Sequence, residues 1–230
     1  ALIVASYYHH AEIVNTLLAA NANVDQVNGA EAATPLFYAC RQGHTEVVMT
    51  LLAANANVDL ANNHGATPLY VACHANPPRS MVTMEPPMWR EKIREREAIV
   101  AALLRAGANV DARGDETPLK AAVWDRTYGQ RCPPSDVVSM LIAAGADIEA
   151  SNASGFFVLY TAAQHGRCDT VRRLLAAGAD PHRRSSNDHA LTALHGATLT
   201  CNSHAYPPLL RAGAALPELD RRDAYLDKIA

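Results

Sequence analysis

The chain has 230 residues, a formal net charge of −3, 49% hydrophobic residues and only 6% aromatic residues. Alanine alone accounts for 44 positions, so the composition favours helices over sheets, which draw on aromatic and β-branched side chains. The longest uninterrupted apolar run, 98–104, is too short to span a membrane, and the slight negative charge argues against a nucleic-acid footprint over the whole chain.

The cysteines and the first residues indicate the compartment. Five cysteines without close pairing do not form a disulfide framework, and free thiols favour a reducing environment. Residues 1–10 have neither a basic start nor a sustained apolar stretch, so they do not predict a signal peptide. We therefore expect an intracellular protein, cytoplasmic or nuclear, without membrane insertion. The missing initiator methionine indicates a piece cut from a longer chain.

An apolar block recurs along the chain. The block at 13–18 returns at 47–52, 99–104 and 137–142, and it returns at 170–175 with threonine in its first place. Its apolar residues occupy relative positions 0, 1, 4 and 5, which lie on one face of a helix but on both faces of a strand. These segments are predicted helices.

Each predicted helix ends with the same chemistry. Three residues after the block stands a residue that tolerates a positive φ, either asparagine or glycine. These residues are Asn21, Asn55, Gly107, Gly145, Gly178 and Gly213. A short polar tag follows, with Asn-Val-Asp at 23–25, 57–59 and 109–111, and Asp-Ile-Glu at 147–149.

A second kind of helix start recurs at Thr34-Pro35, Thr67-Pro68 and Thr117-Pro118. Threonine accepts a hydrogen bond from a free amide of the first turn, and proline fits the first helical position. Small residues follow on the same helices, and among them we expect Cys40 and Cys73 to be apolar core residues rather than reactive thiols.

Together, the Thr-Pro-Leu start, the Ala-Cys pair, Gly43-His44, the apolar block and the Asn-x-Asp tag resemble the ankyrin repeat of about 33 residues. The resemblance covers nearly the whole chain in six copies. The copies span about 1–27, 28–61, 62–112, 113–150, 151–183 and 184–216. The first lacks its Thr-Pro start, the third and fourth carry insertions, and the last is degenerate.

The resemblance implies an all-α fold, an ankyrin-repeat solenoid of stacked antiparallel helix pairs with hairpin-like connecting loops. We expect a single ankyrin-repeat domain over 1–230, with a charged C-terminal cap at 217–230. A lone copy cannot bury enough apolar surface to fold, and an end copy needs an outer face that water tolerates. The amino-terminal copy shows no such device.

The larger insertion, at about 76–96, contains three methionines, Trp89 and a run of alternating charges. Pro86-Pro87 is expected to begin a lengthened second helix. The methionines and the tryptophan could form an adaptable docking surface, or they could fold back over exposed helix ends.

The resemblance also implies a concave groove lined by the first helices and the loop tips. With Trp89 from the insertion, the candidate partner-binding residues are Tyr7, Tyr8, Arg41, Gln42, His74, Trp89, Trp124, Asp125, Gln164 and His165. Tyrosine, tryptophan and arginine dominate binding hot spots. The alternative is that this row is half-buried and packs against neighbouring loops.

Catalytic signatures are missing from the sequence, so we expect no enzyme, no catalytic residues and no cofactor. The nearest metal-like spacings are His165-x-x-Cys168 and Cys201-x-x-His204, which do not reach the paired pattern of a structural zinc site. We expect no metal.

Charge is distributed unevenly along the sequence. Residues 1–66 carry five acidic residues against one arginine, whereas five arginines crowd residues 167–184, four of them in the fifth copy. Those arginines could attract an acidic partner or a phosphate, or they could form an ordinary solvated helix face.

The predicted function is a non-catalytic protein–protein interaction module that binds a protein partner through the concave groove, with help from the insertion. We expect a monomeric domain with no nucleic-acid partner. The alternative is a regulatory or targeting segment of a larger enzyme or channel, making intramolecular contacts.

Overall fold

The computed structural model describes residues 1–74, 86–112, 114, 116–124, 136–187, 190–200 and 202–214, without the side chains of residues 86–89 and 203. Within these ranges the chain is helical, and an isolated bridge between Ser151 and Phe157 is the only β-type pairing. The chain divides into two compact units, unit 1 (Ala1–Asp147) and unit 2 (Ile148–Ala230).

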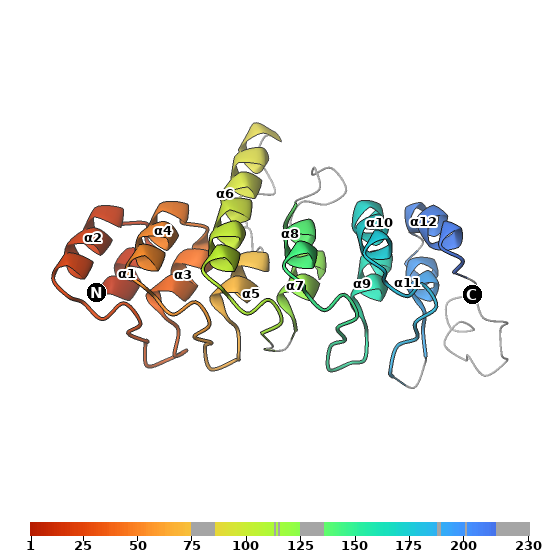
Figure 1. Cartoon of the computed structure of the whole chain (residues 1–230), viewed down its shortest axis with the longest axis horizontal. Helices are drawn as coiled ribbons and strands as arrows, with labels where there is room; N and C mark the ends of the chain where they lie inside the picture. The colour runs from red at the N-terminus through yellow and green to blue at the C-terminus, as the bar shows by residue number, and fades with distance from the viewer. Residues whose placement is uncertain are drawn as a thin grey trace. The chain divides into compact units, whose positions relative to one another are not determined.

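Unit 1 consists of helix pairs stacked in chain order. Its helices are α1 (Leu2–Tyr7), α2 (Ala11–Ala19), α3 (Pro35–Gln42), α4 (Thr45–Ala53), α5 (Pro68–Cys73), α6 (Pro86–Arg105), α7 (Pro118–Trp124) and α8 (Val137–Ala143). The first helices α1, α3, α5 and α7 pack one on the next, and so do the second helices α2, α4, α6 and α8. Figure 1 shows these two rows, with the connecting loops projecting beyond the row of first helices.

Unit 2 repeats this arrangement with two pairs. They are α9 (Val158–Gln164) with α10 (Cys168–Ala176), and α11 (Ala193–Leu199) with α12 (Tyr206–Arg211), the short 3-10 turn η3 (Ser203–Ala205) preceding α12. Helix α9 packs on α11, and α10 packs on α12. The first helices again form one row and the second helices the other.

The predicted Thr-Pro helix starts are confirmed. The hydroxyl oxygens of Thr34, Thr67 and Thr117 each accept a hydrogen bond from the backbone amide three residues later, at 3.1, 3.2 and 3.4 Å. A side-chain acceptor at this position satisfies one of the donors that a helix start leaves free. Phe157 occupies the same position before α9 and offers no such acceptor.

The predicted helix ends are confirmed as well. Asn21 and Asn55 have φ values of 57° and 60°, and the four corresponding glycines lie between 85° and 96°. This left-handed conformation lets the chain turn out of the helix while the last carbonyls are bonded, as in the bond from the Ala56 amide to the Leu51 carbonyl at 3.0 Å.

The core lies between the two rows of helices. Val47, Val48 and Leu51 of the apolar block are fully buried, and so is Cys73, with Cys40 almost fully buried. Burial raises the pKa of the Cys73 thiol to about 12, and it also raises the pKa of Cys40, to which Cys73 adds a smaller effect. The prediction that these two cysteines are core residues is confirmed.

Each predicted copy contains one helix pair, although the copy boundaries and the single-domain assignment stay predictions. Helix α6 begins at Pro86, as expected for the lengthened second helix. The remainder of the insertion, 75–85, and the predicted cap at 217–230 lie outside the described residues. Among the helices described, none combines the length and the apolar character that crossing a membrane requires.

Candidate functional site

Six of the ten predicted partner-binding residues are exposed at the carboxyl ends of the first helices of unit 1. They are Tyr7, Tyr8, Arg41, Gln42, His74 and Trp124, and we call them the helix-end surface. Tyr7, Tyr8 and Trp124 are 38, 63 and 40% exposed, although large aromatic side chains usually bury most of their area. The helix-end surface therefore offers aromatic side chains to solvent.

An aromatic cluster supports the amino-terminal part of this surface. The ring of Tyr7 meets the ring of Tyr8 edge-on at 4.8 Å between centroids, and it meets Tyr38 at 5.8 Å. Tyr38 is itself buried and packs with Phe37 and Ala33. Because edge-to-face contacts favour particular ring orientations, the contacts with Tyr8 and Tyr38 restrict the orientation of the exposed Tyr7 ring.

A hydrogen-bonded network joins this cluster to the loop before α3. The Tyr38 hydroxyl donates to the Glu31 carboxylate at 3.2 Å and accepts from the Asn28 amide at 2.9 Å. Glu31 also lies 3.7 Å from the Arg41 guanidinium. Burial raises the pKa of Tyr38, and the hydrogen bond and charge of Glu31 raise it further. The network holds Arg41 of the helix-end surface beside a carboxylate that the sequence did not single out.

His74 and Trp124 lie at the ends of the later first helices α5 and α7. The His74 ring stacks on Tyr70 with 5.9 Å between centroids. Next to His74, the buried Arg96 of α6 donates through Nε to the Ala72 carbonyl at 2.9 Å, and through Nη2 to the Cys73 carbonyl. The lengthened helix therefore satisfies the last carbonyls of α5 beside the helix-end surface.

The same turn of α6 also reaches α8. The Glu97 carboxylate accepts a hydrogen bond from the Asp136 amide at 2.8 Å, where α8 begins. The part of the insertion near residues 96 and 97 thus has a packing role. The side chain of Trp89 and residues 75–85 lie outside the described residues, so the docking interpretation of the insertion stays a prediction.

Gln164 and His165 are half-buried at the end of α9 in unit 2. The Gln164 carbonyl accepts hydrogen bonds from the Thr200 hydroxyl at 2.7 Å and from the Asn202 side chain. Their half-buried state matches the alternative that this part of the row packs against neighbouring segments. Asp125 lies outside the described residues.

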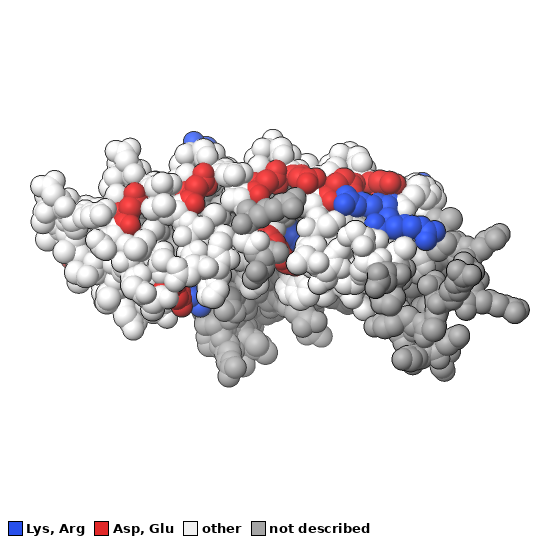
Figure 2. Space-filling model, turned by 90° about the horizontal axis from the view of Figure 1, so that it is seen from below, with Lys and Arg blue, Asp and Glu red and all other residues white. Residues whose placement is uncertain are grey.

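In unit 1, the loops are joined by a repeated hydrogen bond. The carboxylates of Asp25, Asp59 and Asp111, each the last residue of a polar tag, accept from the amides of Asn57, Asn109 and Asp147 at 2.9, 2.9 and 3.0 Å. Figure 2, which looks onto the loop side, shows acidic side chains spaced along unit 1, toward the left. Within each of these tags the asparagine side chain accepts a hydrogen bond from the aspartate amide, and the aspartate carboxylate bonds to the next loop.

In unit 2 one arginine joins the loops more densely. Glu149 accepts from the Asp180 amide at 2.8 Å and forms an ion pair with Arg183 at 2.5 Å. Arg183 also donates to the Glu149 carbonyl and to the Ser151 hydroxyl, the latter at 3.0 Å, and its guanidinium lies 5.3 Å from the centre of the Phe157 ring.

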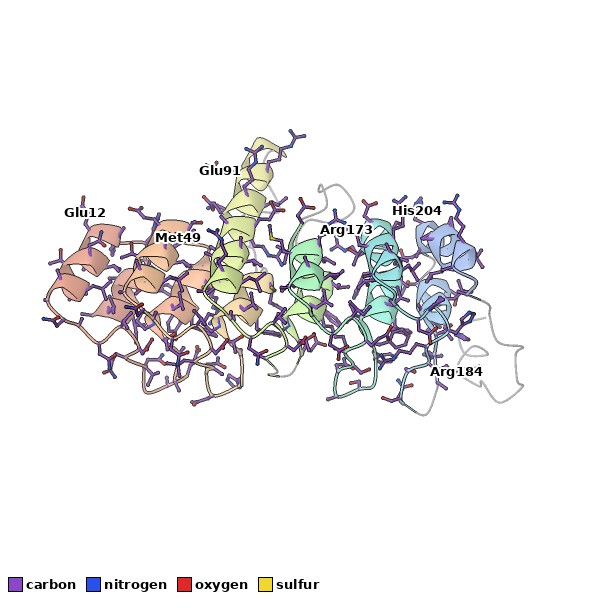
Figure 3. The ribbon with its side chains drawn as sticks, viewed as in Figure 1. Glu12, Met49, Glu91, Arg173, Arg184 and His204 are labelled. Carbon is purple, nitrogen blue, oxygen red and sulfur yellow. The ribbon has the colours of Figure 1, made fainter. Side chains whose placement is uncertain are left out.

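Two of the other arginines between residues 167 and 184, Arg172 and Arg173, lie on α10. Arg172 forms an exposed ion pair with Asp169 at 2.6 Å, and Figure 3 places Arg173 on α10 and Arg184 in the loop after it. Within the described part of the chain, no three histidine, cysteine, aspartate or glutamate side chains are grouped as metal ligands. Cys201 lies outside the described residues.

The stacked helix pairs, their capped starts and their projecting loops define a helical repeat protein. The chain belongs to the ankyrin-repeat family: a family model described as ankyrin repeats in three copies matches residues 2–83, and a model of the single ankyrin repeat matches residues 154–186. Ankyrin repeats are generally protein–protein interaction modules and are typically non-catalytic.

Proposed function

We propose that this chain binds a protein partner through the concave groove implied by its repeats, with the helix-end surface as its principal contact. The proposed partner-binding residues are those of the helix-end surface, together with Trp89, Asp125, Gln164 and His165. The partner's identity is open, because a fold does not specify its ligand.

The observation that carries the proposal is the exposure of aromatic side chains on the helix-end surface. Tyrosine, tryptophan and arginine supply most of the binding energy at protein interfaces, and they do so best where their own conformation is already fixed. Tyr7 lies against Tyr38, and the Arg41 guanidinium lies 3.7 Å from the Glu31 carboxylate. The contact with Tyr38 lowers the conformational entropy that Tyr7 loses when a partner covers it.

The test is capture of a partner by the full chain and by two variants, Trp124→Ala and Arg41→Ala. We expect each variant to recover the same partner at least about fivefold less well, which corresponds to a loss of about 1 kcal/mol. Circular dichroism must show that both variants keep the helical content of the parent chain.

Met49→Ala is the matched control. Met49 is 40% exposed, as Trp124 is, but it lies on α4 in the row of second helices (Figure 3). Capture should survive this change. If capture is unchanged in both Trp124→Ala and Arg41→Ala, the helix-end surface is not the binding site. A partner segment found elsewhere in the same natural polypeptide would instead support the intramolecular, regulatory alternative.

A further inference from the structure

The outer side of the first helix pair, α1 and α2, exposes apolar side chains. These two helices pack on α3 and α4, which follow them in the chain. Val4 of α1 is 57% exposed, and Ile13 of α2 is 50% exposed. Leu17, one helical turn after Ile13, is half-buried. We call Val4, Ile13 and Leu17 the outer face.

The later second helices bury the residues that correspond to Ile13 and Leu17. The counterparts of Ile13 in the apolar block are Val47, Ile99 and Val137, and those of Leu17 are Leu51, Leu103 and Leu141; each is no more than 1% exposed. Residues four apart lie on the same side of a helix, so Ile13 and Leu17 form one stripe.

The other apolar positions of the block do not differ in this way. Val14 is fully buried like Val48, and Leu18 is half-buried like Leu52. The two second helices therefore differ in burial along one stripe alone. The outer face is apolar like a buried interface. On α4 the corresponding side chains are buried, with α2 packed on that helix, whereas no described helix packs on the outer face.

The first helix gives the same result. Val4 corresponds to Tyr38, which stands 34 positions later and is 9% exposed. The preceding helix pair supplies part of that cover, since the Tyr7 ring lies against Tyr38. Val4 has no such neighbour among the described residues.

Two polar groups of the first helix pair likewise lack the contact that their counterparts in the second pair make with the preceding pair. His44 bonds through Nε2 to the Tyr7 carbonyl of the preceding pair at 3.0 Å, and the Asn57 amide donates to Asp25 of the preceding loop at 2.9 Å. Their counterparts 34 positions earlier are His10 and Asn23. Both are exposed, and no described residue accepts a hydrogen bond from the His10 ring or from the Asn23 amide.

We propose that the outer face is a stacking surface for a further ankyrin-type helix pair, supplied by the same polypeptide ahead of α1. The stripe of Ile13 and Leu17 takes its second helix, and its loop provides a carboxylate for the Asn23 amide. The carbonyl at the end of its first helix meets His10. The occupant comes ahead of α1 because, throughout unit 1, this side of a helix pair contacts the pair that precedes it in the chain.

The test extends the full chain at its amino terminus with a second copy of residues 34–67. Ala1 then takes the place that Pro68 has after Thr67, and the added copy presents its Asp59 carboxylate toward Asn23. We expect the urea midpoint of unfolding to rise and exchange of the Asn23 amide to slow by about tenfold or more, because that amide gains a hydrogen bond. Asp59→Ala within the added copy should remove the protection of Asn23 while leaving most of the rise in midpoint.

Ile13→Asp separates stacking from other effects. In the unextended chain this exposed position should tolerate the change without a shift in midpoint, whereas in the extended chain the change should abolish the gain. Met49→Asp at the original position, not in the added copy, is the matched control. It should change the urea midpoint equally in both chains. An extension that changes neither the midpoint nor the Asn23 exchange overturns the proposal. So does an unextended chain that sediments as a dimer and becomes monomeric with Ile13→Asp, since a second copy would then be the occupant.

Discussion

The two units join their loops by different means. In unit 1 a hydrogen bond from a backbone amide to an aspartate recurs three times between successive loops, at nearly the same distance. In unit 2 the corresponding joint combines that bond, made by Glu149, with the Arg183 guanidinium, which also contacts Ser151 and Phe157. Unit 1 distributes its loop contacts over single hydrogen bonds. Unit 2 has such bonds too, as from the Ser186 amide to the Gly155 carbonyl at 3.1 Å, and it adds one side chain, Arg183, that makes several contacts.

The comparison shows that one backbone geometry can be held by different chemistry. Phe157 replaces the capping threonine before α9, and so it removes an acceptor there, whereas Thr192 keeps a capping box before α11. The same ring provides an aromatic face for Arg183. A guanidinium suits this position because it donates in several directions within one plane and stacks on aromatic rings.

The largest expected effect is that of Arg183→Ala in unit 2. Loss of the ion pair, the hydrogen bonds and the contact with Phe157 should lower the free energy of unfolding by about 2–3 kcal/mol. Arg183→Lys keeps the charge but not the fork of donors, so it should cost about half as much. Urea denaturation of the full chain measures both. Equal stability of Arg183→Ala and the parent would show that unit 2 does not depend on one side chain.

The cap before α5 should have the next largest effect. Thr67→Val removes the acceptor for the Tyr70 amide and should cost about 1 kcal/mol, whereas Thr67→Ser keeps a hydroxyl and should cost much less. Urea denaturation of the two variants side by side provides the measurement. If valine and serine are equivalent, the capping bond does not stabilise the start of α5.

A single loop joint of unit 1 should contribute less. Asp59→Ala removes the acceptor for the Asn109 amide and should lower the free energy of unfolding by about 0.5–1 kcal/mol. Asp59→Asn retains an oxygen in place and should cost less than half of that. The difference between the two variants in urea separates the hydrogen bond from the charge. A loss as large as that of Arg183→Ala would contradict the view that unit 1 distributes its contacts.

The smallest effect concerns thiol chemistry. Cys40 and Cys73 of unit 1 are buried, whereas Cys168 of unit 2 is half-buried. At pH 8 in the folded chain, a thiol reagent should modify Cys168 at least about tenfold faster than the other two, since reaction requires an accessible thiolate. Mass spectrometry of the labelled peptides measures the rates, and equal labelling of all three would disprove the expectation.

The same cysteines set a dependence on pH. Burial raises the pKa of Cys73 from 9.0 to about 12, so the unfolded chain loses this proton first as the pH rises. The stability that the neutral thiol contributes is therefore complete below pH 9 and declines as the pH rises from 9 toward 12. In a Cys73→Ala variant this decline should be smaller.

The features that depend on neighbours along the chain could be predicted from the sequence. The capping of Thr34 and Thr67, the positive φ of Asn21 and Asn55 and the burial of Cys73 all follow from local patterns repeated at a fixed spacing. Repetition made these predictions more specific, because a helix start, an apolar block and a helix end that recur together are not expected by chance.

Contacts that occur once could not be obtained in this way. Glu31 reaches Tyr38 across a loop, and Arg96 reaches the end of a different helix. Such pairs have no periodic signal, and in the sequence each of these residues resembles an ordinary surface charge. The exposure of Tyr7 and Trp124 was predicted because it follows from their place at helix ends; the half-buried state of Gln164 depends on Thr200 and Asn202, which follow much later in the chain.

Tyr38 gives the protein a constraint on its evolution. One phenol is shared between the loop at residues 28–31 and the aromatic ring that Tyr7 presents to solvent. Surface loops usually drift freely among relatives, because little depends on their sequence. Here a change at Asn28 or Glu31 would disturb Tyr38, against which the exposed Tyr7 ring packs. In ankyrin-repeat relatives with a tyrosine at the position of Tyr38, we therefore expect this loop and the exposed aromatic residue to vary together.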